Sequence, residues 1–220
     1  HHFELDNIEL GLLGAHQRTN AAIAVAAVKA FEIVQATKLP KTEKQPWQFS
    51  DNQIRKGLAD ARLAGRTEVI SKSPTVIIDI AHNVASVAAL VETLQELTAW
   101  NESHRKTLIF AASREKDVEA MLKPLLPIFD SIVFTKYQNN PRGKLIAELL
   151  EIGQRLKENL GPGSCVTELS SQPTPDEAWK TVSEIAGKND FICIAGSAFL
   201  VAELRADAAS RAHTTISVWW

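Results

Sequence analysis

Strand-like and helix-like segments alternate along residues 66–209, and this alternation constrains the fold more than any other feature of the sequence. Residues 75–80 form a nearly continuous run of β-branched residues, which is typical of a strand buried on both faces. Residues 84–97 follow it with apolar side chains at helical spacing. The repeated pattern predicts an α/β fold, with a mainly parallel sheet and helices on both faces. Further strands are expected at 107–111, 131–135, 164–169 and 191–195, and further helices at 117–126, 145–160, 175–186 and 197–209.

Residues before 66 lack this alternation. An Ala-rich helix is expected over 20–36, and helical spacing of its apolar residues predicts one buried face. Residues 37–50 carry two Pro and several Lys without periodicity, which is typical of a loop or linker. Ser50 is a candidate N-cap for a short helix that runs through Leu58. The expected buried face of the first helix consists of Ile23, Ala27, Ala30 and Val34.

Composition excludes several classes of protein. The formal net charge of −2 over 220 residues gives no basic field, so neither nucleic acid nor a membrane surface is an expected partner. The two cysteines, at 165 and 193, form neither a disulfide framework nor a four-ligand zinc site. We therefore assign no metal ligand and expect a reducing, cytoplasmic setting. No apolar run reaches the roughly 20 residues of a membrane span, and the start at His1 does not resemble a signal peptide.

Polar residues directly follow the first predicted parallel strand. Asp79, His82 and Asn83 place an acid, an imidazole and an amide between that strand and a helix. Ligands of open α/β sheets bind beyond the carboxyl ends of the strands, and a helix N-terminus suits a phosphate or carboxylate. Asp79 is a candidate acceptor for a ribose hydroxyl. The alternative is purely structural: Asn83 caps the helix, Asp79 caps a neighbouring loop, and His82 is a satisfied polar residue.

Other strand ends carry weaker signals. Gly196 permits a tight turn and close ligand approach, while Ser197 either caps the next helix or holds a substrate carboxylate. Arg66 lies in a loop. Residues 114–117 are predicted to be solvent-exposed charged residues, with Asp117 as the N-cap of the next helix, and residues 139–142 are predicted to form a turn. The sequence contains neither a Walker-type loop nor a Gly-x-Gly-x-x-Gly motif. It therefore predicts no phosphate cradle of its own.

Short motifs, taken in order along the chain, resemble those of folylpolyglutamate synthases. Residues 79–83 resemble the Asp-Gly-Ala-His-Asn motif of that family, and residues 13–21 resemble its Leu-Gly-x-His-Gln-x-x-Asn-Ala segment. Each motif is modest alone, but the ordered set is specific and extends over almost the whole chain. The other matches are to Pro-Gly-Arg-Leu-Glu-Val at 64–69, Lys-Asp at 116–117, Asn-Pro-Arg at 140–142 and Gly-Ser-x-x-x-Val-Ala-Glu at 196–203.

Folylpolyglutamate synthases belong to the Mur ligase group, whose members have an ATP-binding P-loop domain followed by a smaller Rossmann-like domain. The resemblance implies that residues 1–36 end the first domain, 37–64 form a linker and short helix, and 65–212 form the Rossmann-like carboxy-terminal domain. Residues 213–220 remain as an apolar tail, which is either an added edge strand or a segment packed on the core. The P-loop, the magnesium ligands and most of the folate site would lie upstream of this chain.

The resemblance also implies a reaction, that of an ATP-dependent carbon–nitrogen ligase. ATP phosphorylates the terminal carboxylate of a folate, and the amine of L-glutamate attacks the acyl phosphate to give an amide, ADP and phosphate. ATP and magnesium are the implied cofactors. Folate, L-glutamate and the upstream P-loop domain are the implied partners. Because the phosphate loop is missing, we expect this chain alone to have no turnover.

The family's nucleotide-site residues carry over by motif. Asn20 would contact adenine, Arg66 would reach the ATP phosphates, and Asp79 would bind the ribose. Asn83 is assigned to the same nucleotide site. Ile80 departs from the family pattern because it replaces a glycine, and its side chain is expected to narrow the pocket where the strand leaves the sheet.

His82 and Ser197 would lie near the ATP and glutamate sites, and they are the candidate catalytic residues. Two alternatives stay open: another Mur-type ligase that acts on a peptidoglycan precursor, and a non-catalytic nucleotide- or amino-acid-binding module of the same fold. The sequence also leaves open whether the parent adds the first glutamate to dihydropteroate, since that choice depends on a pterin site outside this chain.

Overall fold

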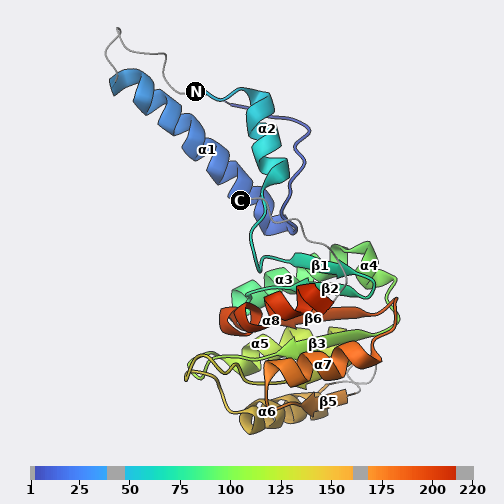
Figure 1. The fold of residues 1–220 in the computed structure, drawn as a ribbon. Helices are drawn as coiled ribbons and strands as arrows, with labels where there is room; N and C mark the ends of the chain where they lie inside the picture. Colours follow the sequence, from blue (N-terminus) through green and yellow to red (C-terminus); the bar gives the residue numbers. More distant parts are fainter. Residues whose placement is uncertain (1–2, 39–47, 161–167, 212–220) are drawn as a thin grey trace. The chain divides into compact units, whose positions relative to one another are not determined.

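The computed structural model describes residues 3–38, 48–160 and 168–211. The chain divides into two compact units, His1–Leu63 and Ala64–Trp220. The described part of the first unit contains helices and no strand, whereas the second unit contains a sheet covered by helices (Figure 1). The apolar tail expected at 213–220 lies outside the described residues.

The first unit contains α1 (Ala15–Lys38) and α2 (Asp51–Asp60). At the start of α2, the Ser50 hydroxyl accepts a hydrogen bond from the Gln53 N–H, and the Gln53 side chain accepts one from the Ser50 N–H. This reciprocal pair satisfies backbone donors that a helix start leaves unpaired, and it confirms Ser50 as the predicted N-cap. The Gly11 N–H donates to the Leu58 carbonyl oxygen at 2.9 Å, which ties the segment before α1 to α2.

The expected helix over 20–36 is present as α1, but the prediction that one face of it is buried is wrong for this chain. Ile23 is 62% exposed and Val34 is 43% exposed, and Ala27 and Ala30 are exposed as well. Periodicity shows that a helix face is apolar, but it does not show what covers that face. An apolar groove of about 750 Å³ runs along α1 and is lined mainly by α1 and by the segment before it.

By length and composition alone, Ala15–Thr37 is long and apolar enough to cross a bilayer. The sequence shows no uninterrupted apolar run there, because Arg18, Lys29 and Glu32 fall within the segment. A core helix of a soluble protein passes the same test, so this property is only a weak indication of a membrane segment. Lys29 and Glu32 form an ion pair at 3.1 Å on this helix.

The second unit is built on a six-stranded sheet in the order β1-β2-β6-β3-β4-β5. The pairs from β2 to β5 are all parallel, and β1 is an antiparallel edge strand. The predicted α/β fold with a mainly parallel sheet is therefore confirmed. The strands are β1 (Glu68–Lys72), β2 (Thr75–Ile78), β3 (Lys106–Phe110), β4 (Ser131–Phe134), β5 (Glu168–Ser171) and β6 (Phe191–Ala195).

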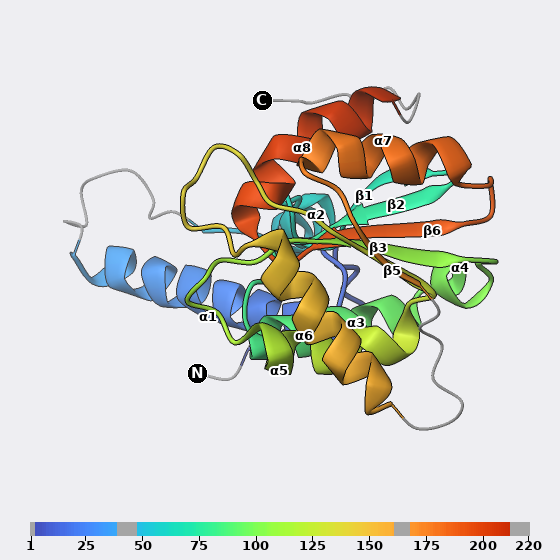
Figure 2. The same ribbon diagram turned by 90° about the horizontal axis from the view of Figure 1, so that it is seen from below.

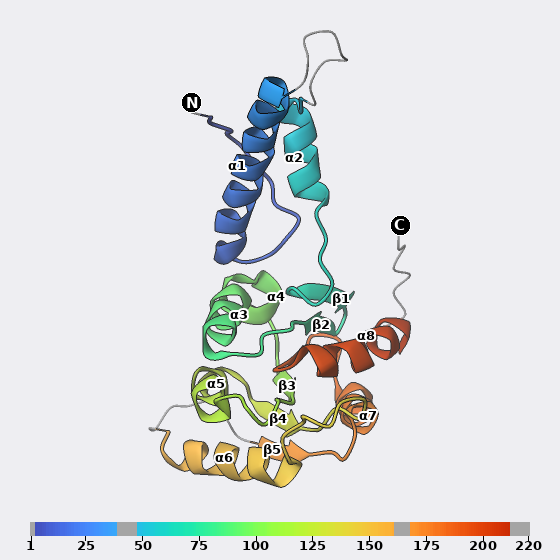
Figure 3. The ribbon, with the colours of Figure 1, turned by 90° about the vertical axis from the view of Figure 1, so that its left-hand side faces the viewer.

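Helices cover both faces of this sheet (Figures 2 and 3). In β2, Ile77 joins one apolar cluster, while Val76 and Ile78 join the cluster on the opposite face. This burial on both sides explains why the strand is a continuous apolar run. One face carries α3 (Val84–Glu96), α5 (Val118–Leu125) and α6 (Ile146–Glu158), and the other carries α7 (Pro175–Ile185) and α8 (Ala198–Arg211).

Two short helical elements complete the second unit, α4 (Thr98–Asn101) and the 3₁₀ turn η1 (Leu126–Ile128). The helix expected over 117–126, with a stop at Pro127, ends as an α-helix at Leu125, one residue before its expected end, and the chain continues as η1, which contains Pro127. The strand expected at 164–169 is described only from residue 168, and it extends to Ser171 as β5.

Candidate functional site at the carboxyl edge of the sheet

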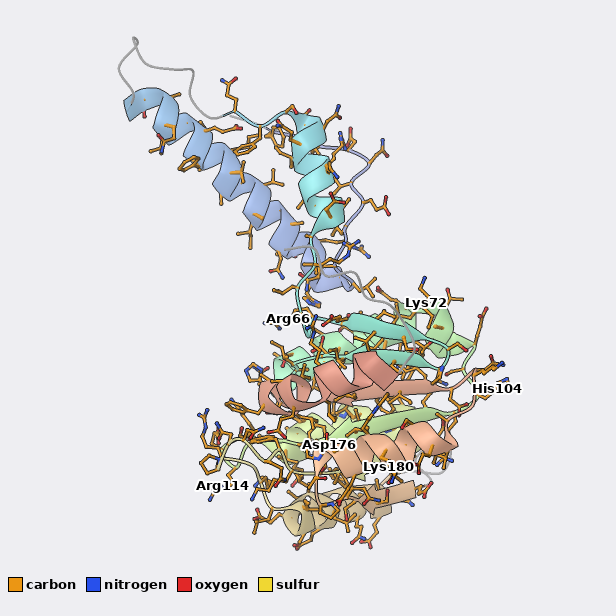
Figure 4. All side chains as sticks on the ribbon, in the orientation of Figure 1. Arg66, Lys72, His104, Arg114, Asp176 and Lys180 are labelled. Atoms are coloured by element: carbon orange, nitrogen blue, oxygen red, sulfur yellow. The ribbon has the colours of Figure 1, made fainter. Side chains whose placement is uncertain are left out.

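The carboxyl ends of the parallel strands meet at one edge of the sheet, which is where open α/β folds bind ligands. The chain leaves β2 and β3 toward the face that carries α3 and α5, but it leaves β6, which lies between them, toward α8 on the opposite face. This divergence is a topological switch point. Figure 4 shows Arg66 and Arg114 at this end of the sheet and Lys72 and His104 at the opposite end.

Asp79 directly follows β2 and is only 7% exposed. Its Oδ2 accepts hydrogen bonds from the Thr67 backbone N–H at 2.7 Å and from the Thr67 hydroxyl at 3.0 Å, and its Oδ1 accepts from the Ala81 N–H at 2.7 Å. A carboxylate offers about four acceptor positions, so roughly one remains for a ligand. The structure therefore shows the loop-capping role directly, and a ribose contact would have to use that remaining position.

Arg66 lies in the turn that precedes β1, between Gly65 and Thr67. Its side chain is partly exposed, and no hydrogen-bonded or ionic partner is found for it among the described residues. A guanidinium that is free of carboxylates can bind a phosphate or carboxylate of a ligand through paired N–H donors. Asp79 and Asn83, the other predicted nucleotide ligands in the second unit, both have side-chain hydrogen bonds within the described residues, so Arg66 is the one whose side chain is unpaired there.

His82 is held by its ring nitrogen Nδ1, which lies 3.0 Å from the carbonyl oxygen of Ile80. A carbonyl oxygen only accepts hydrogen bonds, so this contact assigns the proton of the neutral ring to Nδ1. The other nitrogen, Nε2, then carries a lone pair. A fixed neutral imidazole of this kind can accept a proton or a hydrogen bond from a ligand.

Asn83 caps α3. Its side-chain oxygen accepts from the Ser86 N–H at 2.9 Å, while the Ser86 hydroxyl accepts from the N–H groups of Asn83 and His82 at 3.1 and 3.0 Å. The capping alternative considered for Asn83 is thus what the structure shows. The same bonds fix the backbone of His82, which keeps the imidazole at the helix start.

Gly196 and Ser197 form the turn from β6 into α8. Gly196 has a φ of +109°, and a Cβ at this position would lie 2.4 Å from the Ala111 carbonyl oxygen. The expected tight turn is therefore present, and the close approach that requires glycine is made by Phe110 at the end of β3 and by Ala111, which follows it. Ser197 is 3% exposed, and its hydroxyl accepts from the Phe199 N–H at 3.2 Å, as a helix cap does.

Two long-range contacts that sequence reasoning missed connect the neighbouring loops. The carboxylate of Glu203 in α8 accepts from the backbone N–H groups of Gln138 and Asn139 at 2.7–3.0 Å. The buried hydroxyls of Ser113 and Tyr137 are hydrogen-bonded at 2.7 Å. No local signal predicts these pairs, although Glu203 lies in one of the motifs that resemble the synthases.

The loops after β3 and β4 also carry two arginines. The Arg114 side chain donates to the Pro141 carbonyl oxygen, and the Arg114 N–H donates to the Arg142 carbonyl oxygen at 2.9 Å. The guanidinium of Arg142 lies 5.3 Å from the centroid of the Phe199 ring in α8. The side chain of Asp117 accepts a hydrogen bond from the Ala120 N–H, and Asp117 is the N-cap of α5, as predicted from the charged residues at 114–117.

Asn20 belongs to the first unit, where its Nδ2 donates to Gln17 Oε1 at 3.0 Å on the first turns of α1. It is therefore not among the residues that the second unit brings to the sheet edge. Within 3–38, 48–160 and 168–211, no group of three or more His, Cys, Asp or Glu is placed to hold a metal ion. Burial raises the pKa of the Cys193 thiol well above its usual range, and the charge of Asp79 adds to this, so the thiol stays protonated.

Comparison with known proteins gives a consistent family. The family model described as Mur ligase, glutamate ligase domain, matches residues 65–198. The dihydrofolate synthase/folylpolyglutamate synthase of Bacillus subtilis (strain 168) is 27% identical over 200 residues, which are 91% of this chain and 41% of that protein. The protein of the same name from Mycobacterium tuberculosis is 34% identical over 196 residues, with 88% and 36% covered.

Solved structures agree with these matches. E. coli FolC in complex with ADP, without folate substrate, aligns with a TM-score of 0.72 at 26% identity, over 94% of this chain and 42% of that chain. Mycobacterium tuberculosis folylpolyglutamate synthase complexed with ADP aligns with a TM-score of 0.72 at 27% identity, over 90% and 41%. The resemblance predicted from the ordered motifs is confirmed. This chain spans about two fifths of the length of the relatives it matches.

Proposed function

This chain belongs to the family of the Mur ligase glutamate ligase domain, and from that premise we propose that it is the carboxy-terminal part of an ATP-dependent ligase that adds L-glutamate to a folate. The observation that carries the proposal is the match of about nine tenths of the chain to dihydrofolate synthase/folylpolyglutamate synthases. The two solved relatives that are complexed with ADP support a nucleotide as cosubstrate.

The reaction needs an activated carboxylate, because a free carboxylate resists attack by an amine. Transfer of the γ-phosphoryl group of ATP to that carboxylate makes an acyl phosphate, from which phosphate can leave when the amine of glutamate attacks. Negative charge builds on the phosphate oxygens during both steps and must be held by cations and N–H donors. In this chain, the free guanidinium of Arg66 suits that task.

The other predicted site residues fit supporting roles. Asp79 retains roughly one acceptor position, which suits a ribose hydroxyl. The lone pair on His82 Nε2 suits a hydrogen bond from the incoming ammonium or the uptake of its proton. Ser197 and Asn83 shape the helix starts at this edge, and Asn20, in the first unit, is proposed as the adenine contact.

The phosphate-binding loop and the magnesium ligands are proposed to lie in an upstream domain that ends with residues 1–36. The exposed apolar face of α1 supports this, because such a face is stabilised when another element packs on it. ATP and magnesium would then be held mainly by that domain. A cytoplasmic location is proposed for the complete enzyme, in line with its folate substrate and the absence of a disulfide framework.

The experiment is an ADP-release assay with the full-length protein that carries this sequence, in the presence of ATP, magnesium and L-glutamate. Dihydropteroate and tetrahydrofolate are supplied in separate reactions, which also decides whether the parent has dihydrofolate synthase activity. We expect ADP release that depends on glutamate and on at least one of these substrates, and none from the isolated 220-residue chain. Nucleotide binding without turnover by the full-length protein would favour the non-catalytic module instead.

A further inference from the structure

The turn that carries Arg66 has a strained backbone. Gly65 has a φ of +67° and Thr67 has a φ of +45°, both in the left-handed region. A β-branched residue such as threonine adopts that region only when surrounding contacts hold it there. Arg66 lies between these two residues, so the direction of its guanidinium depends on whatever holds the turn.

One side of the turn is held by the end of β2. Asp79 accepts from both the backbone N–H and the hydroxyl of Thr67, at 2.7 and 3.0 Å. The Ile80 N–H donates to the Gly65 carbonyl oxygen at 2.8 Å. These bonds fix the carbonyl group of Gly65 and both the backbone N–H and the hydroxyl of Thr67. They do not involve the N–H of Gly65.

The other side of the turn is held by Glu68, and Glu68 is held by Arg205. The Gly65 N–H donates to Glu68 Oε2 at 2.8 Å. Arg205 of α8 donates to both carboxylate oxygens of Glu68 through its Nε and Nη2, at 2.8–3.2 Å. A guanidinium fork of this kind fixes the plane of the carboxylate, and so it fixes the acceptor that Gly65 uses.

We propose that Arg205 is a positioning residue for Arg66, which it serves through Glu68 and the Gly65 N–H. The inference rests on the proposed function, in which Arg66 contacts the phosphates of a nucleoside triphosphate. Arg205 itself is engaged by Glu68 and touches no ligand in this role. It stabilises the conformation of the turn in which Arg66 would contact the phosphates, so less conformational entropy is lost when the nucleotide binds.

The chain offers a matched control for this pair. Arg105 and Glu168 form an ion pair at 2.5 Å, with side chains that are 41% and 57% exposed. Arg205 is exposed to a similar degree, at 42%, but its partner Glu68 is 20% exposed and receives a backbone N–H from a turn. Removal of either arginine breaks an Arg–Glu pair, and only Arg205 is connected to Arg66.

The first experiment uses this chain and measures ¹⁵N relaxation of the backbone amides at 65–67. In Arg205→Ala we expect the order parameters of these amides to fall from about 0.85 to below about 0.6, with an intermediate loss in Arg205→Lys. Arg105→Ala should leave them unchanged. Unchanged order in Arg205→Ala overturns the positioning role, and if that variant fails to fold, unchanged order in Arg205→Lys does so.

The second experiment measures steady-state kinetics in the full-length protein. We expect Arg205→Ala to raise the KM for ATP by about 3- to 10-fold without changing the KM for glutamate, and to add nothing in an Arg66→Ala background. Additive losses in the double variant overturn the proposed route through Arg66. Normal kinetics in Arg66→Ala overturn the proposed contact between Arg66 and the phosphates. The relaxation data distinguish this outcome from a failure of the positioning role, because they report on the order of residues 65–67 without any nucleotide.

Discussion

Gly196→Ala tests the closest backbone approach at the site. An added Cβ would lie 2.4 Å from the Ala111 carbonyl oxygen and 2.7 Å from the Phe110 ring, and both residues are buried at the carboxyl end of β3. Neither neighbour is the far end of a flexible side chain, so relief requires β6 to move away from β3. The left-handed φ of +109° costs an alanine about 1–2 kcal/mol, and overpacking adds about 1–3 kcal/mol. We expect a total loss of about 2–5 kcal/mol in the free energy of unfolding.

Urea denaturation of this chain, followed by far-UV circular dichroism, measures that loss as a shift of the midpoint at constant slope. Gly187→Ala is the control, because a Cβ at this exposed position lies 3.5 Å or more from its neighbours in the same unit. The control should change the free energy of unfolding by less than about 0.5 kcal/mol. A Gly196→Ala protein as stable as the control would refute the argument that this turn is shaped by the approach of β3.

Three further contacts around the site can be tested by the same denaturation assay. Tyr137→Phe removes the buried hydroxyl bond to Ser113 and should cost about 1–2 kcal/mol, while Ser113→Ala should cost less in that background than alone. Asn83→Ala should cost about 1 kcal/mol through loss of the α3 cap, and Asn83→Asp should restore most of it. Burial raises the pKa of Glu68, but hydrogen bonds from Arg205 and from the Gly65 backbone N–H outweigh burial, so the folded pKa lies below the ordinary glutamate value of 4.5. Its ionised form therefore stabilises the fold above about pH 4.5, and the advantage of the natural chain over Glu68→Gln should shrink as the pH falls from about 4.5 through the lowered pKa. A constant difference across that range would contradict this assignment.

The fold was predictable where local pattern and burial agree. The run at 75–80 predicts a strand buried on both faces, and β2 has Val76 and Ile78 on one side with Ile77 on the other. β5 was harder, because an edge strand of sequence Glu-Leu-Ser-Ser has little β-branched or apolar character. The helix over 20–36 was predictable as a helix, but the exposure of Ile23 was not, since a single sequence does not reveal what packs on an apolar face.

The sequence predicted which strand ends carry the candidate site residues, but it predicted only some of the contacts between those residues and the rest of the fold. Asp79, His82 and Asn83 are neighbours in sequence, so their grouping follows from the strand–helix junction. Arg205 and Glu68 are 137 residues apart, and their pairing depends on α8 packing beside β1. Sequence spacing carries no information on such a contact. The role of Glu68 in holding the turn at Gly65 could therefore be inferred only from the three-dimensional structure.

Ile80 illustrates how a departure from a family pattern is accommodated. The resemblance places glycine at this position, and the added side chain was expected to narrow a pocket. In the structure, the Ile80 side chain lies over Gly65, where an added Cβ would approach Ile80 Cγ2 to 2.7 Å and Val201 Cγ1 to 3.2 Å. Gly65 thus serves twice, through its left-handed φ and through the space that it leaves for Ile80. Arg66, the residue proposed to bind phosphate, lies in the same turn. The side chain of Ile80 therefore adds an apolar contact to the hydrogen bonds that hold this turn.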